Sequence, residues 1–465
     1  MQADALAATL LSRQDAVSSL VVLEESWAIR SGEANIANMM RNAKTLRSDG
    51  GFYGWMALAG AALVYFGSCG IFYYTYGVFL PIMCDDLGWS RAAVAGGLSL
   101  GMLCVGLPSP LIGASIARFG PRVNMVFGNL LAALGLAGMS LAQEAWHVYF
   151  FFSLSGLGVG FGLYMACTTV VNNWFVRKRS LGMGLVVAAG GLGGFLFPPL
   201  VTWLISTIGW QMSWVALAGI YFTFTVVIGG LILVRNKPED LGQVPDGVSI
   251  EPVMEKERIS YHSIVYQSPV DWRVKQAIRK PATWLITTIS AANFFAIGTI
   301  SAHQVAYLKD VGFTPIIAAM SLSVLAGMSI VGRLGFGALA LRFEVRHLAI
   351  ASFAVQLIAL AILLTTRNLT LIYVYAALFG ISYGGLITAL PTFVGGYYGR
   401  THYAQILGLI FPVGMIAEAA GPVLAGAIYD ATTTYTPAFA TVAVISFVGF
   451  VSAILVRPPK AAPIN

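Results

Sequence analysis

The feature that most constrains this chain is the recurrence of long apolar stretches from Trp55 to Val456, separated by short polar interruptions. The hydrocarbon core of a bilayer requires about 20 consecutive apolar residues per helix. Only 10% of the residues are charged, whereas soluble domains carry about 25%. Because a helix satisfies its own backbone hydrogen bonds in lipid, we predict an all-α membrane protein.

Hydropathy and helix-breaking residues together predict twelve transmembrane helices. At a rise of about 1.5 Å per residue, each can cross the bilayer with some tilt. Their approximate ranges are 55–80, 90–117, 122–142, 146–173, 180–206, 210–235, 282–309, 314–341, 347–366, 369–397, 402–428 and 436–457.

The distribution of basic residues predicts the orientation. If the N-terminus is cytosolic, 23 of the 27 Lys and Arg residues lie on the cytosolic side, three lie in outer loops, and Arg333 lies inside a span. This bias places both termini in the cytosol of a multi-pass inner (plasma) membrane protein. It also explains the net charge of +7 without a nucleic-acid partner. Residues 1–50 show no signal-peptide pattern and are interpreted as a cytosolic extension.

A repeat divides the chain into two halves. Gly113 to Arg122 and Gly337 to Arg346 share the pattern G-x4-R-F-x2-R, 224 residues apart. A second pair, Trp174 to Arg177 and Tyr397 to Arg400, recurs at an offset of 223. Parallel repeats of this kind place a substrate near the midplane between the halves. The predicted parts are the extension 1–50, a six-helix half 51–235, a cytosolic linker 236–281, a six-helix half 282–457 and a cytosolic tail 458–465.

These loops resemble the G-x-x-x-D-R-x-G-R-R signature of the major facilitator superfamily, and the resemblance covers about 55–457. Here Ala117 and Leu341 stand at the acidic position. Within the superfamily, Asp49 to Trp55, Asn173 to Gly184 and the stretch Gly332-Arg333-Leu-Gly are similar to the monocarboxylate transporter and oxalate/formate exchanger group. That resemblance implies that Arg333 binds the substrate carboxylate. Ser329, one turn earlier, replaces an acidic residue of the animal members.

Two ionisable residues inside the spans are the main candidates for function. A buried arginine is costly in a bilayer unless it faces a cavity or a partner, and its planar fork fits a carboxylate. Arg333 therefore binds a small carboxylate or forms an ion pair with Glu418, and we favour the former. Glu418 lies in an apolar, glycine-bounded stretch. It is either a proton carrier or a protonated packing residue.

Further candidates line the predicted path. His303 could meet an anion, titrate, or form a hydrogen bond at an outer gate. Tyr164 and Tyr383, in equivalent helices of the two halves, match tyrosines that line the site in relatives, although core packing would also explain them. Tyr73 or Tyr74 in the first helix and Asn293 in the seventh complete the set, Asn293 as a lining group or an interhelical hydrogen-bonding group.

The sequence thus predicts a secondary transporter of small organic anions that works by alternating access, through proton symport or anion exchange. The transport unit is expected to be a monomer in lipid, with a small carboxylate and possibly protons as its partners. A drug or metabolite exporter of the same fold and a non-transporting ligand sensor are the alternatives. We find no set of metal ligands, no cofactor motif, and no nucleophile with a base that would indicate an enzyme.

Overall fold

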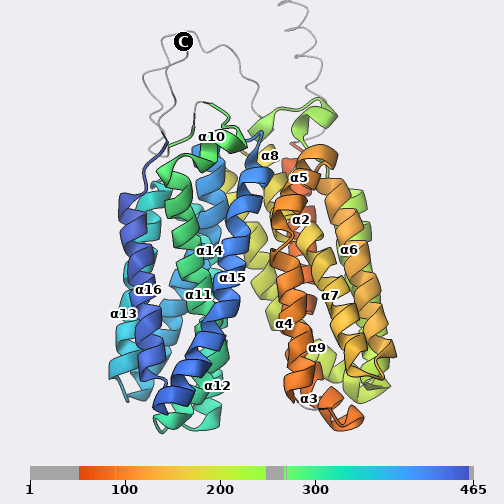
Figure 1. Cartoon of the computed structure of the whole chain (residues 1–465). Helices are drawn as coiled ribbons and strands as arrows, with labels where there is room; N and C mark the ends of the chain where they lie inside the picture. The colour runs from red at the N-terminus through yellow and green to blue at the C-terminus, as the bar shows by residue number, and fades with distance from the viewer. Residues whose placement is uncertain (1–51, 90, 248–265, 269, 460–465) are drawn as a thin grey trace, which may run out of the picture. The chain divides into compact units, whose positions relative to one another are not determined.

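The computed structural model describes residues 52–89, 91–247, 266–268 and 270–459. The predicted extension 1–50, part of the predicted linker and most of the predicted tail lie outside the described residues. The chain divides into two units, one holding residues 1–53 and 247–251 and the other 54–246 and 252–465. The membrane-spanning helices all belong to the second, called here the helical unit (Figure 1).

The first part of the helical unit, residues 54–233, supplies the first six spans. In order these elements are α2 (Gly54–Ser68), the π-helix η1 (Cys69–Tyr73), α3 (Tyr76–Leu87), α4 (Arg91–Gly106), α5 (Ser109–Phe119), α6 (Pro121–Gly138), the short η2 (Met139–Leu141), α7 (Ala145–Gly162), α8 (Tyr164–Trp174), α9 (Arg179–Tyr221) and the π-helix η3 (Phe222–Leu233).

Short elements and six further helices follow. They are η4 (Pro238–Leu241), η5 (Pro245–Gly247), α10 (Val274–Ile278), α11 (Pro281–Asp310), α12 (Pro315–Leu339), α13 (Val345–Thr365), α14 (Leu369–Tyr398), α15 (Tyr403–Thr432) and α16 (Thr436–Leu455).

The twelve predicted spans are all present among the described residues. Ten continuous helical stretches are long and apolar enough to cross a membrane. One of them, Arg179–Leu233, is 55 residues long and is broken at Gly209, whose φ of 77° is left-handed, so it supplies two spans. The pair α4 and α5, bent by 47°, supplies the remaining one. The predicted twelve-helix fold class is therefore confirmed.

The helices form two groups that lie side by side (Figure 1). In the first group, α2 to η3, α6 and α4 pack on α7, and α2 packs on α9 and η3. In the second, α11 to α16, α12 and α13 pack on α14, and α11 packs on α15 and α16. Two main contacts join the groups, α9 with α12 and α5 with α15. The joining helices hold equivalent places in the two halves, as the repeat predicts.

Small residues allow close approach where the groups meet. A Cβ on Gly184 of α9 would lie 2.6 Å from the backbone oxygen of Arg333 and 3.1 Å from the Cα of Gly337, both on α12. Side chains at these positions would push the two groups apart. In membranes, where lipid is as apolar as leucine, such close van der Waals contacts are a main source of helix association.

A buried polar cluster fixes the first group internally. The Asn129 Oδ1 atom on α6 accepts hydrogen bonds from the Ser68 hydroxyl at 2.9 Å and the Tyr221 hydroxyl at 2.6 Å. The Asn129 Nδ2 atom donates to the Gly162 carbonyl at 3.4 Å and to the Met125 carbonyl of its own helix at 2.8 Å. One buried amide thus connects α2, α6, α7 and α9.

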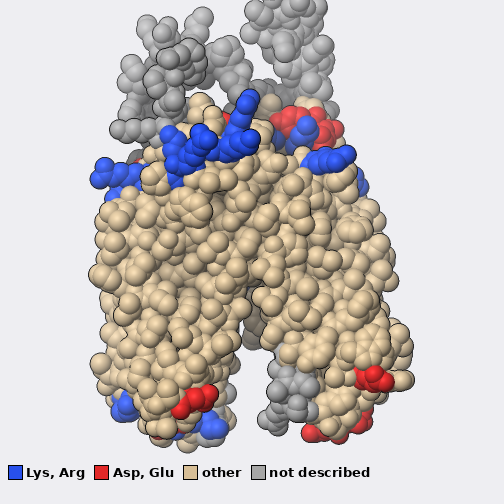
Figure 2. Space-filling view, viewed as in Figure 1, with Lys and Arg blue, Asp and Glu red and all other residues tan. Residues whose placement is uncertain are grey.

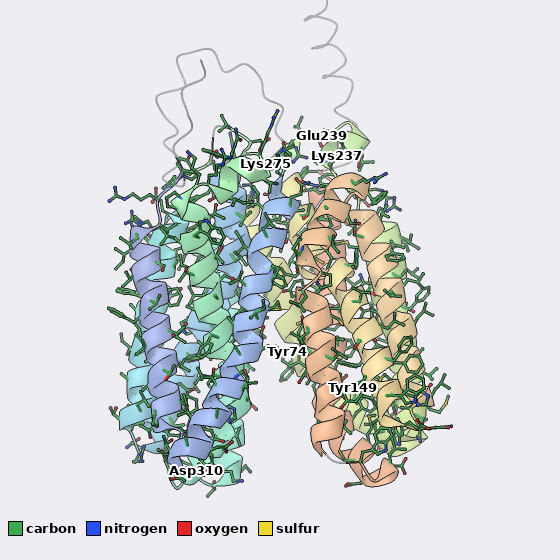
Figure 3. The ribbon with its side chains drawn as sticks, viewed as in Figure 1. Tyr74, Tyr149, Lys237, Glu239, Lys275 and Asp310 are labelled. Carbon is green, nitrogen blue, oxygen red and sulfur yellow. The ribbon has the colours of Figure 1, made fainter. Side chains whose placement is uncertain are left out.

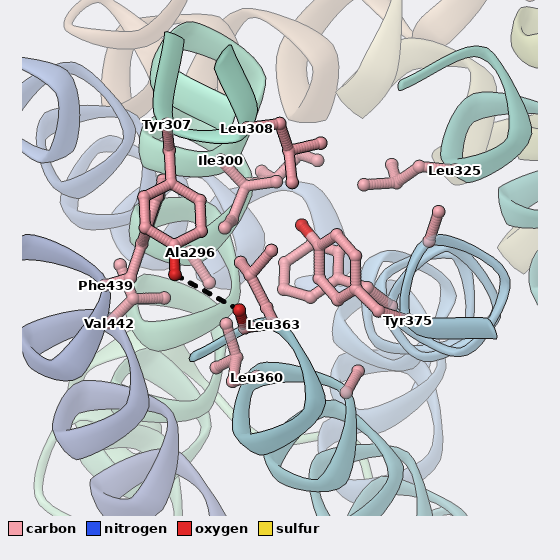
Figure 4. Close-up of a cluster of buried hydrophobic side chains, with 14 of the residues drawn as sticks. Ala296, Ile300, Tyr307, Leu308, Leu325, Leu360, Leu363, Tyr375, Phe439 and Val442 are labelled. Atoms are coloured by element: carbon pink, nitrogen blue, oxygen red, sulfur yellow. Dashed lines mark hydrogen bonds between the residues drawn. The ribbon is translucent and has the colours of Figure 1, made fainter. Parts of the chain in front are cut away.

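The second group has an apolar core that contains hydroxyls with partners (Figure 4). Tyr307 donates to the Leu363 carbonyl at 3.2 Å. Tyr375 donates to the Gln304 Oε1 atom at 2.9 Å, and the Gln304 amide donates to the Ser321 hydroxyl at 2.7 Å. These bonds connect α11, α12, α13 and α14, so each group is stabilised by its own contacts.

The two ends of the helical unit differ. The described parts of segment 235–281 gather at one end, called here the linker end, where Lys and Arg side chains also concentrate (Figure 2). At the opposite end the surface is hollowed between the two groups (Figure 2). In this structure the groups therefore meet at the linker end and part toward the other.

We predict that Asn129→Ala lowers the stability of the purified protein. The Ser68 and Tyr221 hydroxyls would lose their shared acceptor, which costs about 1–2 kcal/mol. Thermal unfolding in detergent measures this as a fall in Tm. Thr223→Ala is the control, because the Thr223 hydroxyl is exposed and donates only to the Gly219 carbonyl of its own segment. Equal Tm values for the two variants would contradict the role given to Asn129.

Candidate functional site

Arg333 lies in the second half of α12, where this helix faces the other group. Its side chain is only 2% exposed. The Nη1 atom donates to the Val187 carbonyl on α9 at 3.0 Å, so the guanidinium reaches from one group to the other. The Nε atom is buried and has no hydrogen-bond partner. A buried charged fork with an unused donor is an incomplete arrangement that an anion would complete.

Aromatic rings surround this guanidinium. Its Cζ atom lies 5.7 Å from the centre of the Tyr383 ring on α14, within cation–π range. Tyr65 and Tyr74 from the first membrane span lie within its electrostatic range. The Tyr74 side chain is 37% exposed and lies between the two groups (Figure 3). The cation therefore lies among tyrosine side chains that come from both groups.

Glu418, on α15, shares this environment without pairing with Arg333. Arg333 and Glu418 are both described, and they form no ion pair. Cys69, Tyr74 and Tyr383 each lie within electrostatic range of both charged groups. The Glu418 side chain is half-buried. The sequence left an ion pair between Arg333 and Glu418 open, and the structure instead shows two separate charges around one set of residues.

Glycines on α9 shape the wall opposite Arg333. A Cβ on Gly191 would lie 3.3 Å from the Arg333 Nη1 atom and 2.6 Å from the Ile330 side chain. A Cβ on Gly194 would lie 2.7 Å from the Tyr74 ring. The absence of side chains at these positions lets Arg333 reach the Val187 carbonyl and lets the Tyr74 ring lie against the helix. Gly191 and Gly194 of α9 thus allow close packing around the candidate site.

The predicted tyrosines occupy different environments. Tyr164 is 7% exposed and donates to the Ile387 carbonyl in the other group at 3.3 Å, with its ring stacked on Phe411 at 4.8 Å. Its hydroxyl therefore already has a partner between the groups. Tyr73 is half-buried, and its ring meets Phe72 edge-on at 5.2 Å. Among the predicted tyrosines, Tyr74 and Tyr383 are the ones placed around Arg333.

His303 lies away from this centre, near the end of α11. Its two ring nitrogens lie 3.3 Å from the Tyr435 hydroxyl and 3.0 Å from the Pro422 carbonyl. These contacts join α11 to α15 and to the start of α16. Both ring nitrogens of His303 are therefore engaged in hydrogen bonds, while its role at an outer gate stays a prediction.

Asn293 and Ser329 are buried polar residues that differ in their hydrogen bonding. Asn293, on α11, is 2% exposed and its Oδ1 atom has no hydrogen-bond partner. The Ser329 hydroxyl donates to the Ala326 carbonyl of its own helix at 2.7 Å, and its backbone lies against Gly384 on α14. Ser329 therefore supports close packing of α12 on α14, which carry Arg333 and Tyr383.

Tyr65, Cys69 and the Val187 carbonyl were not among the residues predicted from the sequence. Tyr65 and Cys69 lie beside Gly190 of α9, whose Cβ would fall 2.8 Å from the Tyr65 ring and 3.0 Å from the Cys69 sulfur. Helical spacing of Tyr65, Cys69 and Tyr73 along one face was the available signal. Among the described residues, no group of three His, Cys, Asp or Glu side chains could hold a metal ion.

Comparison with known proteins agrees with this architecture. The model of the Major Facilitator Superfamily matches residues 58–343 and 331–465. Monocarboxylate transporter 13 of Rattus norvegicus is 27% identical over 427 residues, which cover 90% of this chain and 91% of the relative. The oxalate:formate antiporter of Oxalobacter formigenes is 23% identical over 433 residues, which cover 92% of this chain and 97% of the relative.

Solved structures show the same fold. The fucose transporter FucP in its outward conformation and the human organic anion transporter MFSD10 each superpose with a TM-score of 0.63 at 14% identity. Each comparison covers 86% of this chain and 98% of the other. The described helices and these matches lead to one conclusion: the chain belongs to the Major Facilitator Superfamily and is a multi-pass membrane transporter related to the monocarboxylate transporters and the oxalate:formate antiporter.

Proposed function

We propose that this protein carries small organic anions of the monocarboxylate type by alternating access, as a monomer in the cell inner (plasma) membrane. The observation that carries the proposal is Arg333, a buried guanidinium between the two groups with an unpartnered Nε atom and no acidic partner among the described residues. Placing such a charge in a bilayer costs several kcal/mol, with values from about 2.5 to over 10. A function that uses the charge explains its presence.

The shape of the guanidinium favours a carboxylate as its ligand. Two parallel N–H groups can donate to the two carboxylate oxygens, and the Nη1 bond to Val187 holds the fork in place. The rings of Tyr74 and Tyr383 can cover a short carbon chain. The relatives, which are named as monocarboxylate transporters and an oxalate:formate antiporter, support the same substrate class.

Access in this state is from the end opposite the linker. We place the linker end and both termini in the cytosol, because the Lys and Arg side chains gather there. The hollow between the groups then faces outward, and we propose that an anion from outside enters there and reaches the buried Arg333. Release on the other side requires the groups to part at the linker end, which is rocking of two rigid halves about a fixed site.

Coupling depends on Glu418 in this proposal. A carboxyl group that shares the substrate environment and has no cationic partner can exchange a proton with the cavity as the site opens and closes. Proton symport would use that step. Anion exchange would not, because one anion would leave as the next enters. His303, bound to Tyr435 and Pro422, is a weaker proton carrier because both of its nitrogens are engaged.

We predict that Arg333→Ala abolishes uptake of lactate, pyruvate, acetate or formate into proteoliposomes. Arg333→Lys should keep the charge but lose the fork, so uptake should fall at least about tenfold. Radiolabelled substrates, supplied with and without an inward proton gradient, provide the measurement. Normal uptake by Arg333→Ala would overturn the proposed function.

We predict that Gly191→Val impairs transport while the protein still folds. The added side chain would contact Ile330 and the Arg333 Nη1 atom and displace the guanidinium from the Val187 carbonyl. The expected result is a higher KM for the carboxylate at a similar Tm. Gly219→Val, after the break at Gly209, is the control, because a Cβ there meets no atom within 4 Å. Equal KM values for both variants would argue against the placement of Arg333.

We predict that Glu418→Gln separates the two forms of coupling. If the protein is a proton symporter, this variant should lose uptake driven by a proton gradient, because the amide carries no titratable proton. Exchange of external against internal carboxylate should continue. Gradient-driven uptake equal to that of wild type would exclude Glu418 as the proton carrier.

A further inference from the structure

Two aspartates of the linker bind equivalent turns of the two halves. The Asp246 carboxylate accepts hydrogen bonds from the backbone N–H groups of Val176 at 3.0 Å and Arg177 at 2.7 Å, between α8 and α9. The Asp271 carboxylate accepts from the backbone N–H groups of Arg400 at 2.6 Å and Thr401 at 3.3 Å, between α14 and α15. These turns are the repeated pair found 223 residues apart in the sequence. Each aspartate thus fixes one turn to its own end of the linker.

A different contact crosses between the two groups. Glu239 lies on η4, directly after the first group, whereas Arg400 lies in the turn before α15 of the second. The Arg400 Nη1 atom donates to the Glu239 Oε1 atom at 2.7 Å, and its Nη2 atom donates to the Oε2 atom at 2.9 Å. Two parallel charge-assisted bonds of this kind fix both distance and orientation. Figure 3 labels Glu239 at the linker end.

Other crossing contacts surround this ion pair. The Gln267 amide donates to the Val176 carbonyl at 3.1 Å, and the Asn172 amide donates to the Arg400 carbonyl at 3.5 Å. The buried Arg179 guanidinium donates to the Gly395 carbonyl of α14. All of these bonds join one group to the other, or to the linker segment attached to the other, at the end where the groups meet.

The charge state of the ion pair is fixed near neutral pH. Partial burial raises the pKa of Glu239, but the hydrogen bonds from Arg400 outweigh it and hold that pKa below its ordinary value. Asp271 has a lowered pKa for a similar reason, because bonds from Thr401 and the Arg400 backbone outweigh its partial burial. Both carboxylates are therefore ionised in the cytosol. Acidification would release them only well below neutral pH.

The acidic position of the signature carries no acidic group in either loop of this chain. In this chain the acidic position of the signature is Ala117 in the first copy and Leu341 in the second. Neither side chain can accept a hydrogen bond from a basic residue. Among the described residues, Glu239 and Arg400 form an ion pair at this end that crosses between the groups.

We propose that Glu239 and Arg400 form a latch that holds the linker end closed in the outward-facing state and opens when the transporter faces inward. The proposal rests on alternating access, as proposed above. When the groups part at the linker end, the bonds of Glu239 to Arg400 must break. The bonds of Asp246 and Asp271 can persist, because each joins the linker to one group. The ion pair therefore shifts the equilibrium between the inward-facing and outward-facing states toward the outward-facing one.

The experiment measures the distance between the two groups at the linker end. Val123 on α6 and Phe343 before α13 are 52% and 51% exposed and belong to different groups. Each is replaced by a spin-labelled cysteine in the full chain, with the four native cysteines replaced by serine. Pulsed electron resonance in lipid nanodiscs without substrate then gives the distance distribution.

We predict that Glu239→Gln raises the ratio of long to short distances about two- to five-fold, the effect expected from a partly exposed ion pair. Asp240→Asn is the matched control, because Asp240 is exposed on the same turn and no side-chain bond to it occurs in the structure. It should leave the distribution unchanged. An unchanged distribution for Glu239→Gln, or the same shift for both variants, would overturn the latch.

A charge reversal separates the latch from a merely structural role. Arg400→Glu alone should also raise the long-distance population, and combining it with Glu239→Arg should restore the wild-type distribution. Failure of the double variant to restore it would overturn the ion pair as the cause. Because no substrate is present, this result does not depend on the anion proposal. If the wild-type protein takes up no anion but the distance measurements support the latch, only the proposed substrate is overturned.

Discussion

The arrangement of this protein depends on one buried cation that reaches across the interface between two bundles. Arg333 belongs to α12, yet its hydrogen bond goes to the Val187 carbonyl on α9. Close packing of α9 on α12 at Gly184 and Gly337 makes that reach possible. A guanidinium held this way is stable only where the two groups meet. The same contact therefore ties the candidate binding site to the relative position of the halves, as alternating access requires.

The repeat of the sequence reappears as repeated contacts. The pair α9 and α12 and the pair α5 and α15 join the groups at equivalent places. Asp246 and Asp271 bind equivalent turns near the linker end. Each group has its own buried polar contacts, around Asn129 in one and Gln304 in the other. Because each half is stabilised internally, the few contacts between halves can change without unfolding either one.

Prediction from the sequence succeeded where the physics is local. The span boundaries follow hydropathy, so the predicted range 282–309 corresponds to α11 (Pro281–Asp310). Arg333 stood out because a charge in an apolar span is costly whatever its neighbours. The sequence did not separate Tyr164 from Tyr74, since both are tyrosines in lining helices. The Tyr164 hydroxyl is bound to Ile387, while Tyr74 lies near Arg333. The assignment of site residues stays a prediction.

The sequence by itself determined that the chain spans a membrane, how many times it does so, and that its halves repeat. These properties depend on hydropathy along single helices and on spacing along the chain. Only the tertiary structure decided that Arg333 and Glu418 remain unpaired, that His303 is bound to Tyr435 and Pro422, and that Glu239 meets Arg400 across the linker end. Those outcomes depend on distances between residues that are over a hundred positions apart or on different helices, and hydropathy along one helix carries no information about them.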